Sequence, residues 1–538
     1  MAQTRLFSGP PAASIENLVA VYPAAMLTLY GVITGSFPAL GRTLSRQALV
    51  SCVMMIAGLC VLAKKPTARA IAAQLGVVSH DSLTRLLTRG VVTATLLMNA
   101  LLQQALLLSS GMVLPSCLVL DDVLIPKPFS RWIAGAYWDW DHADRRTVFG
   151  HRLVVVLWTN GVVVIPVAFA LWHKRHSAYF LTETATFARQ EYEALLTQHP
   201  AMRPLLASHL AWDGETATLR LTSLAPWERS LIGKAAWADI AGHAANHHRY
   251  RTKNELARCL IYRLVRKGLT GDYITFDSWY ASKENLNMLT RLGLVYYTAI
   301  PCSRTISTAV RSSDAAPMSE TGQSVSVLAA RYTTRDYTPY PQGRLRAMGL
   351  TATLPGLTHS AKLVILKRQN WRQFLRRHLP ADHPIQTRKS PDPNVYLLTN
   401  NCDAPTYQVI LRYRHRWTIE VMFRDLKQHL GLGACQHRSL EAVTIHIALV
   451  MVAYVCLQGL RQHHSASTRE LPDQSMTIGD VKKQIQASVL LPRCEGPASG
   501  LVSGEQQPMP RQVFEALIES EAPQVIRIED IFTLKKPV

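Results

Sequence analysis

Apolar residues in the first 110 positions recur at the three-to-four-residue spacing of helices, and later regions show the runs and alternation of strands. The most apolar stretches, 91–108 and 445–460, predict buried helices. Each is interrupted by Asn or Gln or is shorter than the roughly 20 residues that a membrane span needs. We therefore expect both in a protein core, and we expect residues 1–112 to form a helical N-terminal domain.

Residues 66–90 have the pattern of two short helices joined by a turn at 75–76, with Ser79 placed to cap the second helix. This pattern is typical of a helix-turn-helix, whose second helix contacts DNA. Two helices of a bundle with water-facing arginines fit the same pattern equally well. In the first case, the residues expected to face DNA are His80, Ser82, Arg85 and Arg89.

The middle of the chain predicts strands. CLVLDDVLI (117–125) is an apolar strand interrupted by two aspartates, and 135–146 predicts a loop or an irregular hairpin. Two β-branched runs at 151–172 flank Asn160–Gly161, a strong hairpin signal. These segments predict three consecutive strands, the first of which ends in Asp.

The next segments alternate between helix and strand. Residues 176–267 are expected to be mainly helical, with Asn254 capping the last helix and Gly268 ending it. DYITFDSWYAS (272–282) predicts a strand that runs into Asp277, followed by a helix and a strand at 294–301.

The composition of the chain changes after residue 302. Residues 302–394 are polar and rich in proline, with short β runs, which predicts an inserted β-rich subdomain. A strand at 394–400 and helices follow. Beyond 465 the chain is polar, with short helices expected near 478–487 and 511–519.

Composition favours a polyanionic partner. The 538 residues include 58 Lys and Arg against 37 Asp and Glu, a net charge of +21, so nucleic acid is favoured over an acidic membrane surface.

The nine cysteines are scattered without a CxxC pair and predict reduced thiols in a cytosolic protein. HAANHH (243–248) lacks a cysteine or carboxylate at zinc-ligand spacing. The N-terminus lacks a secretory signal pattern.

Residues 413–427, YRHRWTIEVMFRDLK, concentrate polar chemistry on one predicted helix face. At about 100° per residue, an acid, a phenol and two cations share that face. These are Tyr413, Arg416, Glu420 and Lys427. An adjacent apolar stripe predicts burial of the helix through Ile419, Met422, Leu426 and Leu430. An exposed salt-bridge face is the simpler interpretation of the charged residues.

Three distant acids occupy comparable places: Asp122 at the end of a first strand, Asp277 at the end of a later strand, and Glu420 on a following helix. Carboxylates held on rigid elements can bind divalent ions for phosphodiester chemistry. Competing acids are Asp121, Asp139, Asp141, Asp144 and Asp425.

Two tryptophans lie beside these acids. Trp279 follows Asp277 by two positions, and Trp417 precedes Glu420 by three. Either can stack on an unpaired base, although core packing is the more common role of a tryptophan.

Over about residues 115–460 the sequence resembles the DDE transposases of bacterial insertion sequences, specifically the insertion-sequence family-four type. That family places its third acid in a signature of Tyr, two residues, Arg, three residues, Glu, six residues and Lys, which 413–427 matches without a gap. LDDV and FDSWY match the segments around the first two acids, and the family pattern favours Asp122 over Asp121. Val123 stands where many relatives have Thr.

The resemblance implies an α/β protein with an RNase H-like core. The implied domains are a helical DNA-binding domain (1–112), the first part of the core (113–301), a β-rich insertion (302–394), the completion of the core with the Glu helix (395–464) and a C-terminal region for dimerisation or DNA contact (465–538).

The resemblance also implies a cut-and-paste reaction on the inverted-repeat ends of an element, followed by joining of the 3′-hydroxyls to target DNA. Asp122, Asp277 and Glu420 would hold two Mg²⁺ or Mn²⁺ ions. Arg416 and Lys427 would clamp phosphates with Tyr413 as a supporting donor. The protein would act as a homodimer on paired double-stranded DNA ends, in the bacterial cytoplasm at the nucleoid.

Three other functions are compatible with parts of the sequence. A transposase-derived protein that only binds DNA would not need its acids, and a nuclease of the same core would cut without strand transfer. A basic membrane-surface protein would need an amphipathic basic helix of useful length, and we find none in the sequence.

Overall fold

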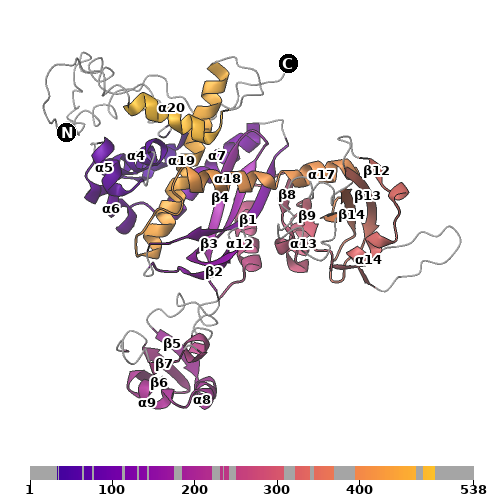
Figure 1. The fold of residues 1–538 in the computed structure, drawn as a ribbon. Helices are drawn as coiled ribbons and strands as arrows, with labels where there is room; N and C mark the ends of the chain where they lie inside the picture. Colours follow the sequence, from indigo (N-terminus) through magenta and orange to yellow (C-terminus); the bar gives the residue numbers. More distant parts are fainter. Residues whose placement is uncertain are drawn as a thin grey trace, which may run out of the picture.

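The computed structural model describes most of the chain (Figure 1). The described residues are 33, 35–62, 66–75, 78–111, 115–129, 133–141, 145–174, 184–220, 224, 231–233, 235–240, 250–307, 322–339, 345–368, 394–467 and 476–490. Several predictions fall outside them: the histidine-rich 243–248, the helix at 511–519 and Asp144.

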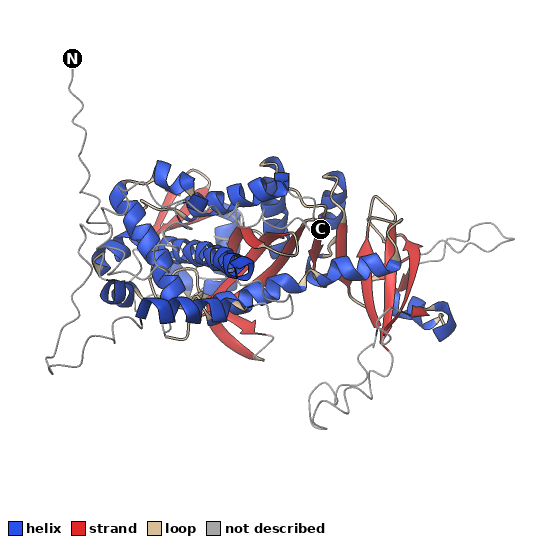
Figure 2. Cartoon of the chain, turned by 90° about the horizontal axis from the view of Figure 1, so that it is seen from above, coloured by secondary structure: helices blue, strands red, loops and turns tan. Residues whose placement is uncertain are grey.

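A ten-stranded mixed sheet forms the centre of the molecule, in the order β12-β13-β14-β15-β9-β8-β1-β3-β2, with β4 also paired to β3. Figure 2 shows helices flanking this sheet. The strands are β1 (Cys117–Pro126), β2 (Tyr137–Asp141), β3 (Arg146–Thr159), β4 (Val164–Trp172), β8 (Tyr273–Phe276), β9 (Tyr296–Ile300), β12 (Thr338–Pro339), β13 (Leu345–Ala352), β14 (Ala361–Arg368) and β15 (Asn394–Thr399).

The predicted strands around the acids are confirmed, but the first does not end in Asp: β1 continues past Asp122 to Pro126, because these residues still pair with β3. β1, β8 and β9 are mutually parallel, and β3 runs antiparallel to β1. The β3–β4 hairpin turns at Asn160–Gly161, where Asn160 Oδ1 accepts the backbone N–H groups of Val162 and Val163 at 3.1 and 2.9 Å. Gly161 has a φ of 85°, a conformation that favours glycine. The irregular hairpin predicted at 135–146 is β2 with the start of β3.

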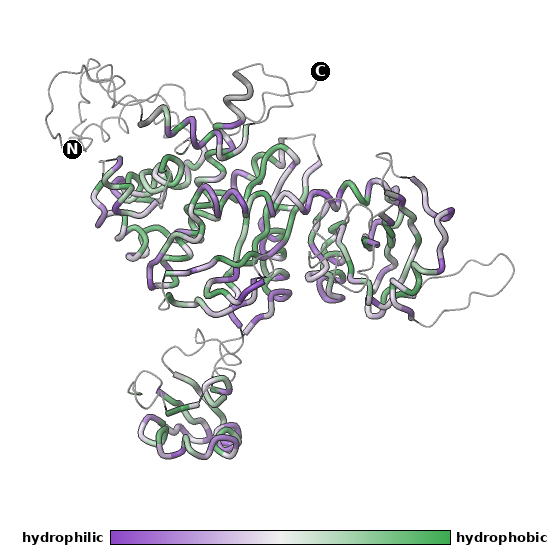
Figure 3. The backbone as a smooth tube through the Cα atoms, viewed as in Figure 1, coloured by the Kyte–Doolittle hydropathy of each residue, from purple (hydrophilic) through white to green (hydrophobic). Residues whose placement is uncertain are grey.

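The N-terminal helices share one hydrophobic core with the sheet. They are α3 (Pro38–Thr43), α4 (Arg46–Val61), α5 (Ala68–Leu75), α6 (His80–Thr88) and α7 (Ala94–Gly111). α4, α6 and α7 pack on α19 (Leu440–Ser467), and α7 also packs on β4. Buried residues of these helices and of the sheet belong to the same cluster. In Figure 3 the tube is hydrophobic along both α19 and the central strands.

α19 is the longest apolar helix of the described residues. Its segment Leu440–Arg461 is long and apolar enough to cross a membrane, with a mean hydropathy of 2.1, but 83% of its most apolar stretch is buried inside the protein. This burial agrees with the core helix predicted at 445–460.

The prediction that 176–267 is mainly helical is wrong in its first half. A separate three-stranded sheet, in the order β5-β7-β6, has its own small core with α8. These elements are β5 (Thr184–Ala188), α8 (Arg189–Gln198), α9 (Met202–Leu206), β6 (Leu210–Asp213) and β7 (Thr216–Arg220). The helix predicted at the end of this region is α12 (Lys253–Arg266), but Thr252, rather than Asn254, caps it by accepting the N–H of Glu255 at 3.2 Å.

Between 302 and 394, the described strands divide between the main sheet and a separate two-stranded sheet of β10 (Thr305–Ile306) and β11 (Gln323–Ser324). β12, β13 and β14 continue the main sheet through β15. A short helix of this region is α14 (Val325–Ala330). Other helices are the short helix at Ser278–Tyr280, α13 (Lys283–Arg291) and α20 (Ile478–Leu490), the last near the predicted 478–487.

The single helix predicted across 413–427 is two helices. α17 (Thr406–Arg414) ends at His415, and α18 (Trp417–Gln428) begins after Arg416. The predicted apolar stripe is confirmed, because Ile419, Met422, Leu426 and Leu430 are fully buried.

Candidate active site

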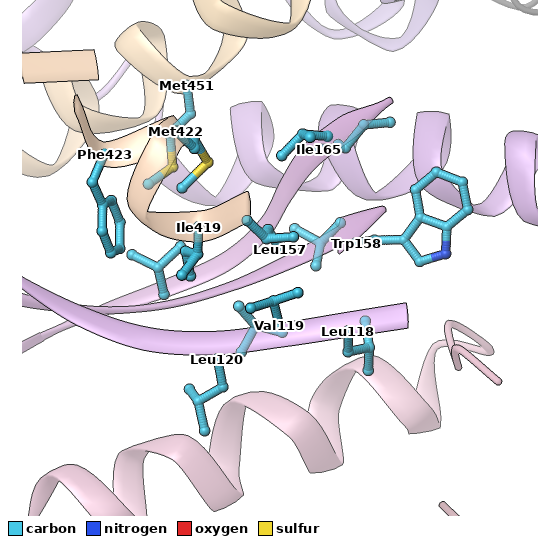
Figure 4. Packing of buried hydrophobic residues seen from close by; sticks show 14 of the residues in the cluster. Leu118, Val119, Leu120, Leu157, Trp158, Ile165, Ile419, Met422, Phe423 and Met451 are labelled. Atoms are coloured by element: carbon cyan, nitrogen blue, oxygen red, sulfur yellow. The ribbon is translucent and has the colours of Figure 1, made fainter. Parts of the chain in front are cut away.

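The adjacent aspartates of β1 lie on opposite faces of the sheet. In Figure 4, Val119 points toward Ile419 of α18, whereas Leu120 points to the other face. Side chains of a strand alternate between faces. Asp121 therefore shares the α18 face with Val119, and Asp122 shares the opposite face with Leu120.

Asp122 is bound by donors from three different elements. Arg152 Nη1 of β3 donates to its Oδ2 at 2.8 Å, and Lys253 Nζ of α12 donates to its Oδ1 at 3.0 Å. The hydroxyl of Tyr280 also donates to Oδ1 at 2.9 Å. The Asp122 side chain is 9% exposed. Asp122 is thus the centre of a buried ionic network.

The same network neutralises Asp139, one of the competing acids. Arg152 Nε contacts Asp139 Oδ2 at 2.5 Å, and Lys174 Nζ contacts its Oδ1 at 3.0 Å. Burial alone raises the pKa of Asp139, but the hydrogen bonds and charges of Lys174 and Arg152 outweigh burial and lower it. Another competitor, Asp425, is buried on α18.

The surroundings of Asp121 raise its pKa, in contrast to those of Asp139. Burial and then the negative charge of Asp277 raise the pKa of Asp121 to about 7. Its Oδ1 accepts the backbone N–H of Asp122 at 2.8 Å, and its Oδ2 contacts Arg416 Nη1 at 3.2 Å. Two carboxylates held this close without full compensation form a site that attracts a cation.

Asp277 reaches the cleft because β8 pairs in parallel with β1. Leu120 is in register with Phe276, so Asp277 follows β8 at the level of Asp121. Asp277 Oδ1 accepts the N–H of Trp279 at 3.0 Å and caps the short helix that follows. Burial, and then the charge of Asp122, raise the pKa of Asp277.

Glu420 on α18 is linked to Asp121 through an arginine. Arg416 Nη2 forms an ion pair with Glu420 Oε1, while its Nη1 contacts Asp121. Burial raises the pKa of the half-buried Tyr413, which interacts with Arg416. The helix break at 415–416 thus leaves Tyr413, Arg416 and Glu420 in one cluster, although they lie on two helices.

An open cleft of about 480 Å³ is lined by aspartates of β1 and of the segment after β8, whereas Arg416 and Glu420 are not among its lining residues. Its lining includes Asp121, Asp122, Asp277, Lys253, Trp279 and Lys427. Trp279 is 60% exposed, and Lys253 Nζ lies 4.3 Å from the centroid of its ring. Trp417 is 62% exposed outside this lining. Neither tryptophan is a core residue, so both can meet a ligand.

The donor atoms of the cleft suit a divalent cation, but the third acid is held away. Asp121, Asp122 and Asp277 supply the carboxylate oxygens that hard cations prefer. Within the described residues, no three carboxylate, imidazole or thiol side chains are grouped so that they could hold a metal ion. The carboxylate oxygens that line the cleft are of the type that binds a divalent cation, and Arg416 pairs with Asp121 and Glu420.

Arg152 and Lys253, the two cations that pair with Asp122, were not identified from the sequence. Lys253 lies at the start of a predicted helix and Arg152 lies in a predicted hairpin strand, and neither residue has a predicted role. Tyr280 stands inside the FDSWY segment and is fully buried. The predicted DNA-facing residues Arg85 and Arg89 are exposed on α6.

The raised pKa of Asp121 gives a pH-dependent effect on stability. In the folded protein this pKa is about 7, above the ordinary value of 3.8, so the folded state binds more protons between these pH values. The free energy of unfolding therefore falls as pH rises through this window. Asp121→Asn is expected to raise the thermal unfolding midpoint at about pH 8 and to change it little near about pH 4, without divalent metal. An equal shift at both pH values would contradict the assignment.

The fold and cleft define an α/β protein in which two aspartates within β1 and one just after the parallel strand β8 line one cleft. Comparisons with protein families agree with this class. Residues 37–342, more than half of the chain, match the model of a DDE superfamily endonuclease, and residues 238–456 match that of a transposase DDE domain. The chain belongs to the DDE superfamily of endonucleases and transposases. Members of this superfamily use divalent metal ions.

A curated relative supports the same family. A protein of Sinorhizobium fredii named "Putative transposase y4zB" is 30% identical over 74 residues. The match covers 14% of this chain and 21% of that relative's length.

Proposed function

We propose that this protein is a cut-and-paste transposase that cleaves the inverted-repeat ends of its own element and joins the 3′-hydroxyls to target DNA. The observation that carries the proposal is the convergence of Asp121, Asp122 and Asp277 in one cleft, with Glu420 linked to Asp121 through Arg416. The sheet supports an RNase H-like core, since β1, β8 and β9 are adjacent and parallel and β3 is antiparallel to β1.

The contacts favour Asp121 as the first metal ligand in this proposal, with Asp277 and Glu420 as the others. Asp121 lies on the face of β1 that meets α18, which carries Glu420. Asp122, the ligand expected from the family pattern, is already bound by Arg152, Lys253 and Tyr280. Its role in the proposal is to anchor β1 to β3 and α12.

Two bound Mg²⁺ or Mn²⁺ ions would activate the attacking water or 3′-hydroxyl and stabilise the leaving oxygen. Lys427 lines the cleft on the exposed side of α18 and holds a DNA phosphate there. Arg416 offers a guanidinium fork for a second phosphate, with Tyr413 beside it as a supporting donor. The exposed rings of Trp279 and Trp417 stack on unpaired bases.

The exposed Arg85 and Arg89 of α6 extend the basic surface to the N-terminal helices and contact double-stranded DNA. The proposed assembly is a homodimer on paired ends in the bacterial cytoplasm, associated with the nucleoid. Sedimentation of the protein with end-containing duplexes tests this assembly: two chains per paired-end complex support it, and one chain per duplex contradicts it.

Incubation with a plasmid that carries the gene and its flanking DNA tests the function. With Mg²⁺ or Mn²⁺, the protein is expected to cut at the element ends and give joined products, and chelation with EDTA is expected to abolish both. Cutting without joined products would indicate a nuclease. Binding without metal-dependent cutting would indicate a DNA-binding protein derived from a transposase.

A further inference from the structure

Arg416 bridges two acids that come from different elements. Its Nη1 lies 3.2 Å from Asp121 Oδ2 on β1, and its Nη2 pairs with Glu420 Oε1 on α18. The side chain of Arg416 is 18% exposed, that of Asp121 16% and that of Glu420 34%. One guanidinium thus joins the strand acid to the helix acid at the edge of the cleft.

Arg416 pairs with carboxylate oxygens of Asp121 and Glu420, the same type of atom that binds a divalent metal ion. A guanidinium keeps its charge at all physiological pH values and presents planar paired donors, so it holds two carboxylates as a fixed internal cation. A divalent ion between Asp121 and Glu420 would meet a positive charge within a few ångströms, which is unfavourable. The guanidinium and the ion therefore compete for the same oxygens.

We infer that Arg416 is a built-in counter-ion that must leave Asp121 and Glu420 before these acids can bind a divalent cation together. The inference rests on the proposed function. It adds a positioning role for Arg416, which holds the two acids in place while the cleft lacks metal.

The counter-ion couples metal binding to DNA binding. A phosphate oxygen at the surface of α18 gives the guanidinium an alternative charged partner. When Arg416 moves to that phosphate, it frees Asp121 and Glu420 for the cation. DNA and divalent metal should therefore raise each other's affinity, since coupling between two sites is reciprocal.

Mn²⁺ binding to the full chain, measured by electron paramagnetic resonance, tests this inference without reliance on activity. Arg416→Gln is expected to bind Mn²⁺ at least about 10-fold more tightly than the wild type, within the usual range of coupling between sites. The matched control is Arg414→Gln, which removes the same charge from an exposed position two residues earlier. We expect the control to change the affinity by less than about twofold, as a distant exposed charge is screened.

A second arm adds a 30-base-pair DNA duplex to the titration. DNA is expected to tighten Mn²⁺ binding by at least about fivefold in the wild type and by less than about twofold in Arg416→Gln, because the glutamine variant has no counter-ion to release. Arg416→Lys serves as a second variant if the glutamine variant does not fold. A lysine keeps the charge but lacks the fork, so its Mn²⁺ affinity should lie above that of the wild type.

The outcomes separate this inference from the proposed function. If Asp277→Asn removes the Mn²⁺ site but Arg416→Gln binds Mn²⁺ no more tightly than the wild type, the counter-ion role is wrong and the metal site stands. If the Asp277→Asn variant binds Mn²⁺ as tightly as the wild-type protein, the cleft is not the metal site and both proposals fail.

Discussion

Asp277→Asn is expected to lower the rate of metal-dependent DNA cleavage by roughly a thousand-fold, because it replaces a ligand charge at the centre of the cleft. Asparagine keeps the size of the side chain and an oxygen that can still accept the N–H of Trp279. The fold should therefore survive, and circular dichroism can verify this. The rate is measured as product formed per unit time from end-containing DNA.

A matched control for this substitution is Asp213→Asn, the same chemical change at an exposed position of β6. It is expected to leave the cleavage rate within about twofold of the wild type, as most surface substitutions have small effects. A folded Asp277→Asn protein that cleaves as fast as this control would remove Asp277 from the active site.

Arg152→Met is expected to destabilise the protein by about 3–5 kcal/mol, the usual loss when one partner of a buried ion pair is removed. Arg152 is 11% exposed and contacts both Asp122 and Asp139. Methionine fills similar space but leaves both carboxylates short of a cation. Urea unfolding followed by far-UV circular dichroism measures the loss.

Two further variants test whether the loss in Arg152→Met comes from the buried ion pairs of Arg152. Arg189→Met breaks an exposed pair with Glu215 and is expected to cost less than about 1 kcal/mol. The double variant Arg152→Met with Asp122→Asn is expected to recover at least about 1 kcal/mol, because the two groups are in contact and their effects do not add. If Arg152→Met costs no more than Arg189→Met, Asp122 is not held by a buried ionic network.

The elements that carry the acids were predictable from sequence because their signals are local. Asn160–Gly161 between β-branched runs predicts the β3–β4 hairpin, and the apolar run before Asp277 predicts β8. The buried stripe of α18 follows from helical periodicity. The register of β1 against β8 does not follow from either strand alone, since pairing depends on both.

The sequence of the strand does not indicate whether Asp121 or Asp122 faces α18, and therefore which of them is the better candidate for the first metal ligand. CLVLDDVLI is apolar on both faces because helices cover both sides of the sheet around β1, so alternation does not identify the α18 face. The two aspartates differ in their distant partners: Asp121 contacts Arg416, 295 residues away, whereas Asp122 contacts Arg152 and Lys253.

The predictions that the structure contradicts have physical causes. The strands at 184–220 are four or five residues long and lie next to good helix-forming sequence, so their signal is weak. The break at 415–416 lies in YRHRW, which contains neither proline nor glycine to indicate it. β14 is visible as a β run, but its partner β15, which joins it to the main sheet, follows it along the chain and could not be assigned in advance.

Anomalous scattering from crystals of the protein soaked in Mn²⁺ gives the most direct test of the proposed active site. We expect a manganese peak bounded by the carboxylates of Asp121, Asp277 and Glu420, with Arg416 turned away from the two acids that it bridges. A peak at Asp122 without Asp121, or no peak in this cleft at saturating Mn²⁺, would contradict that assignment.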